Sequence, residues 1–180
     1  TPDSFFAGSR YWNDPPAALA AAREMVAAGA ALIDVGGAST RPGASPVSTD
    51  EELRRVLPVV ELLVAEGIAV SVDTITPAVA EAALRAGAVM INDVPGLRAG
   101  DELARLVARH HAGICLMHMQ GEPRTMQRRP AYADVVTEVE TFLRGAAAQA
   151  VAAGVDPAAV CLDPGIGFGK TLDHNLALLR

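Results

Sequence analysis

The sequence predicts an α/β fold in which short buried strands alternate with amphipathic helices. Runs of apolar and β-branched residues recur along the chain without the polar alternation of a sheet that faces water on one side, which is typical of parallel strands buried on both faces. Longer amphipathic segments separate these runs. The composition, with 51% hydrophobic and 20% charged residues among 180, excludes a disordered chain and suits one domain with a sizeable core.

Each predicted strand is followed by a predicted helix, and the helix ends carry residues that typically start or stop helices. The expected strands, in chain order, are residues 31–35, 69–72, 89–91, 114–117 and 160–162. The expected helices are 15–28 with Asp14 as N-cap, 51–65 with Thr49 or Asp50 as N-cap, 77–86 with Thr76 as N-cap, 102–109 opened by Asp101, about 134–153, and one that begins near Leu172. This alternation implies a parallel sheet with right-handed crossovers.

A polar residue able to do chemistry ends or follows every predicted strand. These residues are Asp34, Asp73, Asn92 with Asp93, His118 and Asp163. In a TIM (β/α)8 barrel the carboxyl ends of all strands ring one mouth, where the active site lies. A doubly wound sheet would instead concentrate such residues at one switch point. We therefore predict a barrel.

The chain is short for such a barrel, which needs roughly 250 residues. Five parallel strands cannot close it. The sequence opens in what resembles the loop after a strand and stops at Arg180, inside the helix that begins near Leu172. We therefore expect an internal fragment, in which residues 1–180 form one barrel domain truncated at both ends.

Charge and cysteine content exclude several classes of protein. The net charge of −6, without a basic cluster, disfavours binding to nucleic acid. No apolar run approaches the roughly 20 residues that span a bilayer, and the first residues carry no signal-peptide pattern, so we expect a cytoplasmic protein without membrane contact. Cys115 and Cys161 lie in apolar runs, where reduced core cysteines are expected rather than a disulfide.

Asp73, Asn92 and Asp163 form the sharpest candidate site. A carboxylate accepts two parallel hydrogen bonds from an amino-pyrimidinone edge, and an amide matches a neighbouring donor and acceptor pair. The structural alternative is that these residues merely cap the loops that follow their strands. Three such residues on separate strands favour a ligand site.

Two loops carry further candidate groups. In the segment that follows the first strand, Ser39, Thr40 and Arg41 could meet an anion, although an ordinary connection explains the segment equally well. The glycine-rich segment 164–171 fails the phosphate-loop pattern because Pro164 stands where a glycine is needed, so a tight turn explains its glycines. His118 could act as a base or a ligand, but it lacks the partners of a zinc site.

Together these motifs resemble those of bacterial dihydropteroate synthases. The stretches that carry the resemblance are Thr1-Pro-Asp-Ser-Phe5, Ile33-Asp-Val-Gly-Gly37, Ser39-Thr-Arg-Pro-Gly43, Ser71-Val-Asp-Thr74, Ile91-Asn-Asp93, Leu116-Met-His-Met-Gln-Gly121, Leu162-Asp-Pro-Gly165 and Phe168-Gly-Lys170. They occur in the family's order over the whole chain. The resemblance implies a barrel of which the second to sixth strands are present.

The resemblance also implies a transferase of folate biosynthesis. Such an enzyme joins 6-hydroxymethyl-7,8-dihydropterin pyrophosphate to p-aminobenzoate, giving 7,8-dihydropteroate and pyrophosphate, with Mg²⁺ assisting the leaving group. Asp73, Asn92, Met117 and Asp163 would then bind the pterin, with Asp73 also stabilising a developing cation at the reacting methylene. Thr40, Arg41 and Pro42 would belong to a loop that closes over pyrophosphate and aminobenzoate, and Phe168 would contact the aromatic amine.

Departures from the family pattern limit what the isolated chain should do. Ala38 stands where the family usually has an acidic residue, and the family's Mg²⁺-binding Asn lies before Thr1, so we expect no metal ligand in this chain. The late cationic motifs are also absent, so the isolated chain should be poorly active, whereas the full-length protein should form a homodimer. Two alternatives remain open at this point, a methyltetrahydrofolate:corrinoid methyltransferase and a non-catalytic pterin-binding fragment.

Overall fold

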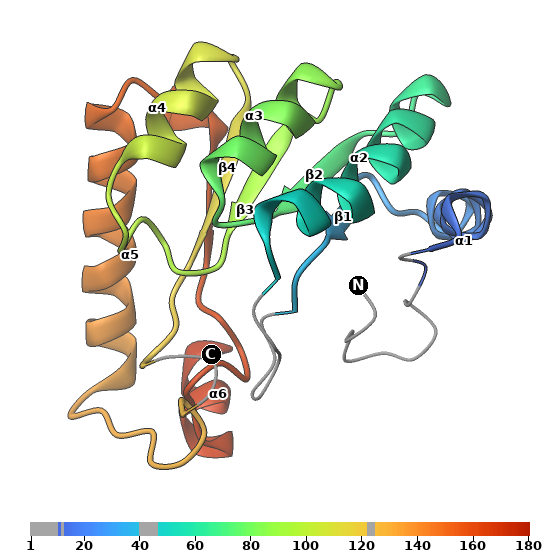
Figure 1. The fold of residues 1–180 in the computed structure, drawn as a ribbon. Helices are drawn as coiled ribbons and strands as arrows, with labels where there is room; N and C mark the ends of the chain where they lie inside the picture. The colour runs from blue at the N-terminus through green and yellow to red at the C-terminus, as the bar shows by residue number, and fades with distance from the viewer. Residues whose placement is uncertain (1–10, 12, 40–46, 122–124) are drawn as a thin grey trace.

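The structure is a computed structural model that describes residues 11, 13–39, 47–121 and 125–180. Strands and helices alternate along the chain, as predicted (Figure 1). In order they are α1 (Pro15–Ala27), β1 (Ile33–Gly36), α2 (Thr49–Ala65), β2 (Val70–Asp73), α3 (Pro77–Arg85), β3 (Met90–Asp93), α4 (Glu102–Arg109), β4 (Gly113–Met117), α5 (Val135–Ala152), the 3-10 turn η2 (Pro157–Ala159), β5 (Val160–Asp163) and α6 (Leu172–Leu178).

The five strands form one parallel sheet in the order β1-β2-β3-β4-β5. Spatial order thus follows chain order, whereas a doubly wound sheet reverses its order at the switch point. Helices α2 to α5 follow one another along one side of the sheet (Figure 1), and each contacts the next. This arrangement is that of five consecutive strand-helix units of a barrel, which confirms the predicted fold class.

The sheet register sorts the strand side chains onto two faces. Side chains directly paired across parallel strands point the same way, and neighbours along a strand point oppositely. Val72, Ile91 and Ile114 are paired in one row, are fully buried and pack in the core with the helices. The adjacent row points away from the helices. It contains Gly36, Asp73, Asn92, Cys115 and Cys161, and we call this side of the sheet the open face.

Local hydrogen bonds explain where the first two helices begin. Asp14 caps α1 as predicted, since its Oδ1 accepts from the N–H of Ala17 at 3.1 Å. Helix α2 begins at Thr49, two residues earlier than expected. Its N-cap is Ser48 rather than Thr49 or Asp50, and the Ser48 hydroxyl oxygen accepts from the N–H of Glu51 at 3.3 Å. Its first turn carries three carboxylates, which the helix dipole favours.

The remaining boundaries differ from the expectations by small steps. Four of the five strands extend at least one residue further towards their carboxyl ends than predicted. In β2, β3 and β5 the reason is that the polar residue itself pairs in the sheet, whereas β1 gains Gly36. Asp34 is an exception to the strand-end pattern, since it is the second residue of β1. Thr171 caps α6 in a capping box with His174, and that helix ends at Leu178, so the expectation that Arg180 lies inside it is wrong.

Among the described residues, no helix is both long enough and apolar enough to cross a bilayer. The principal core lies between the sheet and helices α1 to α5. A smaller cluster, formed by Val94, Met117, Met119 and Met126, lies under the loops at the carboxyl ends of the strands. These loops and the open face hold those predicted site residues that the structure describes, namely Asp73, Asn92, Met117, Asp163 and Phe168.

Candidate functional site

The sheet register brings the four predicted pterin residues to one face. Asp73 pairs with Asn92 across β2 and β3, and Met117 pairs with Asp163 across β4 and β5. The Asp73 and Asn92 row is two positions before the Met117 and Asp163 row in register, so all four belong to the open face. The structure therefore brings these residues together, while the ligand that they bind stays a prediction.

Asn92 is held by a neighbour that the sequence reasoning left without a role. Its amide Nδ2 donates to Asp34 Oδ2 at 3.1 Å, across a separation of 58 residues. This bond turns the amide nitrogen towards β1 and the amide oxygen away from it. The spacing of residues along the strand is a signal for this contact. Asp34 lies two residues before Gly36, which belongs to the open face, so the side chain of Asp34 points to that face as well.

Asp73 has an unusual protonation state. Burial, together with the nearby carboxyls of Asp34, Glu52 and Asp93, raises the pKa of Asp73 to about 8. Its carboxyl group therefore carries a proton at neutral pH when nothing is bound to the open face. A ligand that presents several N–H donors or positive charge would favour the ionised form.

Glu52 supports the turn that follows Asp73. It is buried on α2, and it accepts from the hydroxyl of Thr74 at 2.6 Å and from that of Thr76 at 3.0 Å. Thr76 occupies the N-cap of α3, but its hydroxyl is directed to this carboxylate. Sequence reasoning missed Glu52, because on a helix of mixed polarity nothing marks one carboxylate as buried.

Gly37 allows the loop after β1 to approach α2. A Cβ built there would lie 2.8 Å from Val56 Cγ2 and 2.9 Å from Glu52 Cγ, so any larger residue would push the loop from the helix. Arg55, which lies on the same helix as Val56 and Glu52, donates from its Nη1 to the carbonyl oxygen of Gly37 at 3.0 Å. Residues 40–46 follow, so the predicted contributions of Thr40, Arg41 and Pro42 fall outside the described residues.

Asp93 fits the structural alternative that was considered for strand-end carboxylates. It is buried, and its Oδ2 accepts from the N–H of Leu97 at 2.7 Å. Leu97 has a φ of +61°, a conformation that this hydrogen bond helps to hold. Burial raises the pKa of Asp93, while its backbone hydrogen bonds oppose the rise. Its role is to shape the loop beyond β3.

Lys170 joins the loops that follow β4 and β5. Its ammonium is buried and lies 3.0 Å from His118 Nδ1 and 3.0 to 3.2 Å from the carbonyl oxygens of His118, Gly165 and Phe168. Burial is the main cause that lowers the pKa of Lys170 to about 8. Because every acceptor belongs to one of these two loops, Lys170 fixes one against the other.

His118 is a structural histidine. Its Nδ1 accepts from Lys170, so the neutral ring carries its proton on Nε2. Burial and the positive charges of Lys170 and Arg98 lower the pKa of His118 to about 4. The ring packs edge-on against Phe142, with centroids 5.1 Å apart. The geometry therefore does not support the role of general base or ligand that the sequence left open for it.

The glycine-rich segment 164–171 is a tight turn, as predicted. A Cβ on Gly165 would lie 2.0 Å from the His118 carbonyl oxygen, and one on Gly169 would lie 2.6 Å from that of Gln120. Asp163 Oδ1 accepts from the N–H of Gly165 at 2.7 Å, which closes the start of the turn. Phe168 packs against the cluster that contains Met117. The turn thus places Phe168 beside the predicted pterin residues.

The two cysteines are not the core residues that the sequence predicted. Cys115 and Cys161 are directly paired on the open face, Cys161 is exposed, and both are free thiols. Their strands are apolar, but at these positions the side chains point away from the helices. The expectation of core cysteines is therefore wrong, while the expectation that they are reduced agrees with the structure.

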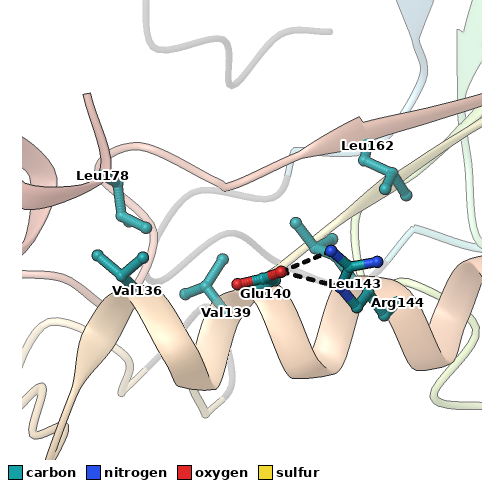
Figure 2. Close-up of a pocket in the computed structure, with 7 residues that line it drawn as sticks. All are labelled: Val136, Val139, Glu140, Leu143, Arg144, Leu162 and Leu178. Atoms are coloured by element: carbon teal, nitrogen blue, oxygen red, sulfur yellow. Dashed lines mark hydrogen bonds and ion pairs between the residues drawn. The ribbon is translucent and has the colours of Figure 1, made fainter. Parts of the chain in front are cut away.

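An apolar pocket lies on the helix side of the sheet, between α5, α6 and β5 (Figure 2). It is lined by Val136, Val139, Glu140, Leu143, Arg144, Leu162 and Leu178. Leu162 points to the side opposite its neighbour Asp163, so this pocket is separate from the open face. The described residues contain no group of three or more His, Cys, Asp or Glu side chains that could hold a metal ion.

Comparisons with known proteins identify the family to which the chain belongs. Residues 1–180 match the family described as pterin binding enzyme. The dihydropteroate synthase of Neisseria meningitidis serogroup C is 45% identical over 100% of this chain and 64% of that protein. The structure of Yersinia pestis dihydropteroate synthase with a sulfonamide drug has a TM-score of 0.92 and 46% identity, covering 99% of this chain and 64% of that one. The Burkholderia cenocepacia enzyme complexed with 7,8-dihydropteroate has a TM-score of 0.84 and 50% identity, covering 92% and 60%. The resemblance seen in the sequence is thereby confirmed, and the chain spans less than two thirds of the length of these relatives.

Proposed function

Because this chain belongs to the pterin-binding enzyme family, we propose that the protein is a dihydropteroate synthase. It would join 6-hydroxymethyl-7,8-dihydropterin pyrophosphate to p-aminobenzoate, releasing pyrophosphate and forming 7,8-dihydropteroate for folate biosynthesis. The observation that carries this proposal is the register that places Asp73, Asn92 and Asp163 on one face. Relatives of the same fold, one of them complexed with 7,8-dihydropteroate, support it.

The pterin ring is the group that the open face would recognise. Asp73 and Asp163 supply carboxyl oxygens for the ring N–H donors, and Asn92 supplies an amide whose orientation is set by Asp34. Met117 offers an apolar contact beside them. Because one Asp163 oxygen already accepts from the Gly165 N–H, the turn fixes the direction in which this carboxylate points.

The second substrate would lie next to the pterin. Phe168 supplies an apolar surface against the Met117 cluster, which suits the ring of p-aminobenzoate. The loop that contains Thr40, Arg41 and Pro42 would close over this ring and the pyrophosphate, as the family resemblance implies. Lys170 and the turn glycines keep Phe168 in position through the contacts described above.

The reaction would proceed by dissociative substitution at the pterin methylene. The C–O bond to pyrophosphate breaks first, and the amine of p-aminobenzoate then forms the C–N bond and releases one N–H proton to solvent. Asp73 would lose its own proton to solvent as positive charge develops on the pterin, and the resulting carboxylate would stabilise that charge. The resemblance implies that Mg²⁺ would assist the departure of pyrophosphate, with its family Asn ligand lying before Thr1. The described residues of this chain contain no group of three or more His, Cys, Asp or Glu side chains that could hold the ion.

The wider assignments are proposals of the same kind. Residues 1–180 would form a pterin-binding domain, and the protein would act in the cytoplasm as a homodimer on small-molecule substrates. It would bind neither nucleic acid nor membrane, in keeping with its net charge of −6.

The proposal is tested with the complete gene product that contains this chain. Calorimetry measures the binding of the pterin substrate, and pyrophosphate release after addition of p-aminobenzoate measures turnover. Asp163→Ala should weaken pterin binding by about ten- to a hundred-fold, since a charge-assisted hydrogen bond contributes about 1.5–3 kcal/mol. Asp173→Ala, which removes an exposed carboxylate of α6, is the matched control and should behave as the parent.

Three outcomes would contradict the proposal. One is pterin binding by Asp163→Ala that equals the parent, which would remove Asp163 from the site. Another is methyl transfer to a corrinoid acceptor by the parent protein, which would favour the methyltransferase alternative. A third is pterin binding without any release of pyrophosphate, whichever of the two substrates is added first, which would favour a binding protein.

A further inference from the structure

Glu52 is a buried carboxylate to which the proposed reaction assigns no step. It lies on α2, is only 4% exposed, and forms no ion pair with any of the described residues. Burying a carboxylate is costly unless hydrogen bonds compensate for the water that it loses. Two hydroxyl groups supply such bonds here, and both belong to the turn that follows β2.

Each oxygen of the Glu52 carboxylate holds one threonine of this turn. Oε1 accepts from the Thr74 hydroxyl at 2.6 Å, and Oε2 accepts from the Thr76 hydroxyl at 3.0 Å. The Thr74 hydroxyl oxygen in turn accepts from the N–H of Thr76 at 3.1 Å, so the two threonines are also tied to each other. Thr74 is buried and comes directly after Asp73, the last residue of β2. The carboxylate therefore fixes the chain immediately beyond Asp73 against α2.

The stem of the Glu52 side chain meets the segment that follows β1. A Cβ built on Gly37 would lie 2.9 Å from Glu52 Cγ and 3.1 Å from the Glu52 carbonyl oxygen. The preceding residue, Gly36, is paired with Asp73, and a Cβ built on Gly36 would lie 3.6 Å from Asp73 Oδ2. One side chain of α2 thus contacts two segments that lie on either side of the same carboxyl group.

We propose that Glu52 is a positioning residue that couples the segment after β1 to the turn after β2 and so holds both beside the Asp73 carboxyl. Because Glu52 belongs to a helix, a shift of either segment changes the contacts of the other. Helix α2 lies between α1 and α3 and contacts both (Figure 1). The network is therefore internal to the packed elements and does not rest on an exposed surface.

The charge of Glu52 makes its position measurable at Asp73. Three carboxyl groups face Asp73, namely those of Asp34 on β1, Glu52 on α2 and Asp93 on β3. Together with burial, which is the largest cause, they raise the pKa of Asp73 to about 8. Removing the charge of Glu52 while keeping its hydrogen bonds should therefore lower the pKa of Asp73. A side chain that only filled space would leave that pKa unchanged.

The first test measures the coupling without any substrate. In the complete gene product, Thr74→Val removes the hydroxyl that binds Glu52 Oε1, and amide hydrogen exchange is followed by mass spectrometry at residues 36–39. Exchange there should be about ten-fold faster than in the parent, because a hydrogen bond to a charged group is lost in the network that holds this segment. Thr74→Ser keeps the hydroxyl and should restore the parent's rate.

Two results of this exchange experiment would overturn the coupling. One is exchange at residues 36–39 that equals the parent in Thr74→Val, whatever happens in the turn itself. The other is an equal acceleration at β4, which lies outside the network and would show a general loss of stability instead.

The second test measures the Asp73 carboxyl directly. Glu52→Gln removes the charge but keeps the length of the side chain, and threonine hydroxyls can accept from an amide as well as donate to it, so both contacts can persist. The ¹³C chemical shift of the Asp73 carboxyl, followed against pH, should give a pKa about one pH unit below that of the parent. Glu61→Gln, the same substitution at an exposed position of α2, is the matched control and should leave the pKa of Asp73 unchanged. An unchanged pKa in Glu52→Gln would overturn the placement of this charge beside Asp73.

The effect on turnover rests on the proposed function and is measured separately. Glu52→Ala loses both threonine contacts, and its kcat/KM for the pterin substrate should fall about a hundred-fold, because small displacements of a positioned group have effects of this size. In Glu52→Gln the rise of kcat/KM with pH should move to lower pH, in step with the pKa of Asp73. Turnover by Glu52→Ala that equals the parent, or a loss in Glu52→Gln that is the same at every pH, would overturn the positioning role in the reaction. If the parent itself does not turn over while the exchange and carboxyl results hold, the failure lies with the proposed function, and the coupling through Glu52 stands.

Discussion

Replacing Asp73 by Asn should stabilise the fold, and the gain should grow with pH. The folded protein holds the pKa of Asp73 at about 8, against 3.8 for the free side chain. Below pH 3.8 both the folded and unfolded states are protonated, so the group contributes nothing. Between pH 3.8 and 8 the unfolded chain releases a proton that the folded protein keeps, so the unfolding free energy falls as pH rises.

The size of the effect follows from the difference between the two pKa values. Each unit of difference corresponds to about 1.4 kcal/mol, so a shift from 3.8 to about 8 has an upper limit of about 6 kcal/mol. Asp73 is only partly buried on the open face, so water screens part of this penalty. We expect Asp73→Asn to gain about 3 kcal/mol at pH 8 and almost nothing at pH 4, since the amide is neutral throughout.

Urea unfolding followed by circular dichroism at pH 4, 6 and 8 measures this gain. Asp173→Asn, an exposed substitution on α6, is the control and should remain within about 0.5 kcal/mol of the parent at each pH. The same Asp73 variant should lose turnover if the proposed function holds. A stability gain of equal size at all three pH values, or a loss that deepens as pH rises, would refute the reasoning about the protonated carboxyl.

Three further substitutions test the loops at the carboxyl ends of β4 and β5. Lys170→Met should lower the unfolding free energy by about 3 kcal/mol in urea titrations, because the acceptors around the ammonium lose their donor; stability equal to the parent would contradict the loop-joining role. His118→Asn should remove a contribution that lowers the unfolding free energy of the parent as pH falls from 6.5 to 4, because in this range the unfolded chain binds a proton that the folded histidine, with a pKa of about 4, does not; a difference in unfolding free energy between parent and variant that stays constant across this range would count against it. Gly165→Ala should destabilise far more than Gly167→Ala in thermal melts: both have positive φ, but only at Gly165 would the Cβ meet a carbonyl oxygen, so equal effects would show that backbone strain alone decides.

The order of elements was readable from the sequence because its signals are local. Caps such as Asp14 and proline at the start of α3 act within a few residues, and apolar runs mark buried strands wherever they occur. Ser48 shows the limit of this reasoning. Ser48, Thr49 and Asp50 are all good capping residues, and only the backbone conformation decides that Ser48 takes the position.

The residues that sequence reasoning missed act through contacts between distant segments. Glu52 meets hydroxyls more than 20 residues away, and Lys170 meets His118 across 52 residues. Nothing in the neighbourhood of either residue reveals that it is buried. The expectation that the cysteines lie in the core was wrong for another reason. Apolar neighbours along a strand do not indicate to which face of the sheet a given side chain points.

Lys170 is the single lysine among the 15 basic residues of this chain, and its amine lies inside the molecule. Every surface cation of the described side chains is therefore a guanidinium or an imidazole, which acylating reagents modify poorly at neutral pH. An amine-selective reagent can reach Lys170 only when the two loops that surround it separate. The rate of acylation of Lys170, measured by peptide mass mapping, therefore reports how often the loops that follow β4 and β5 separate. A ligand that holds these loops together should lower this rate, and the measurement requires no introduced label.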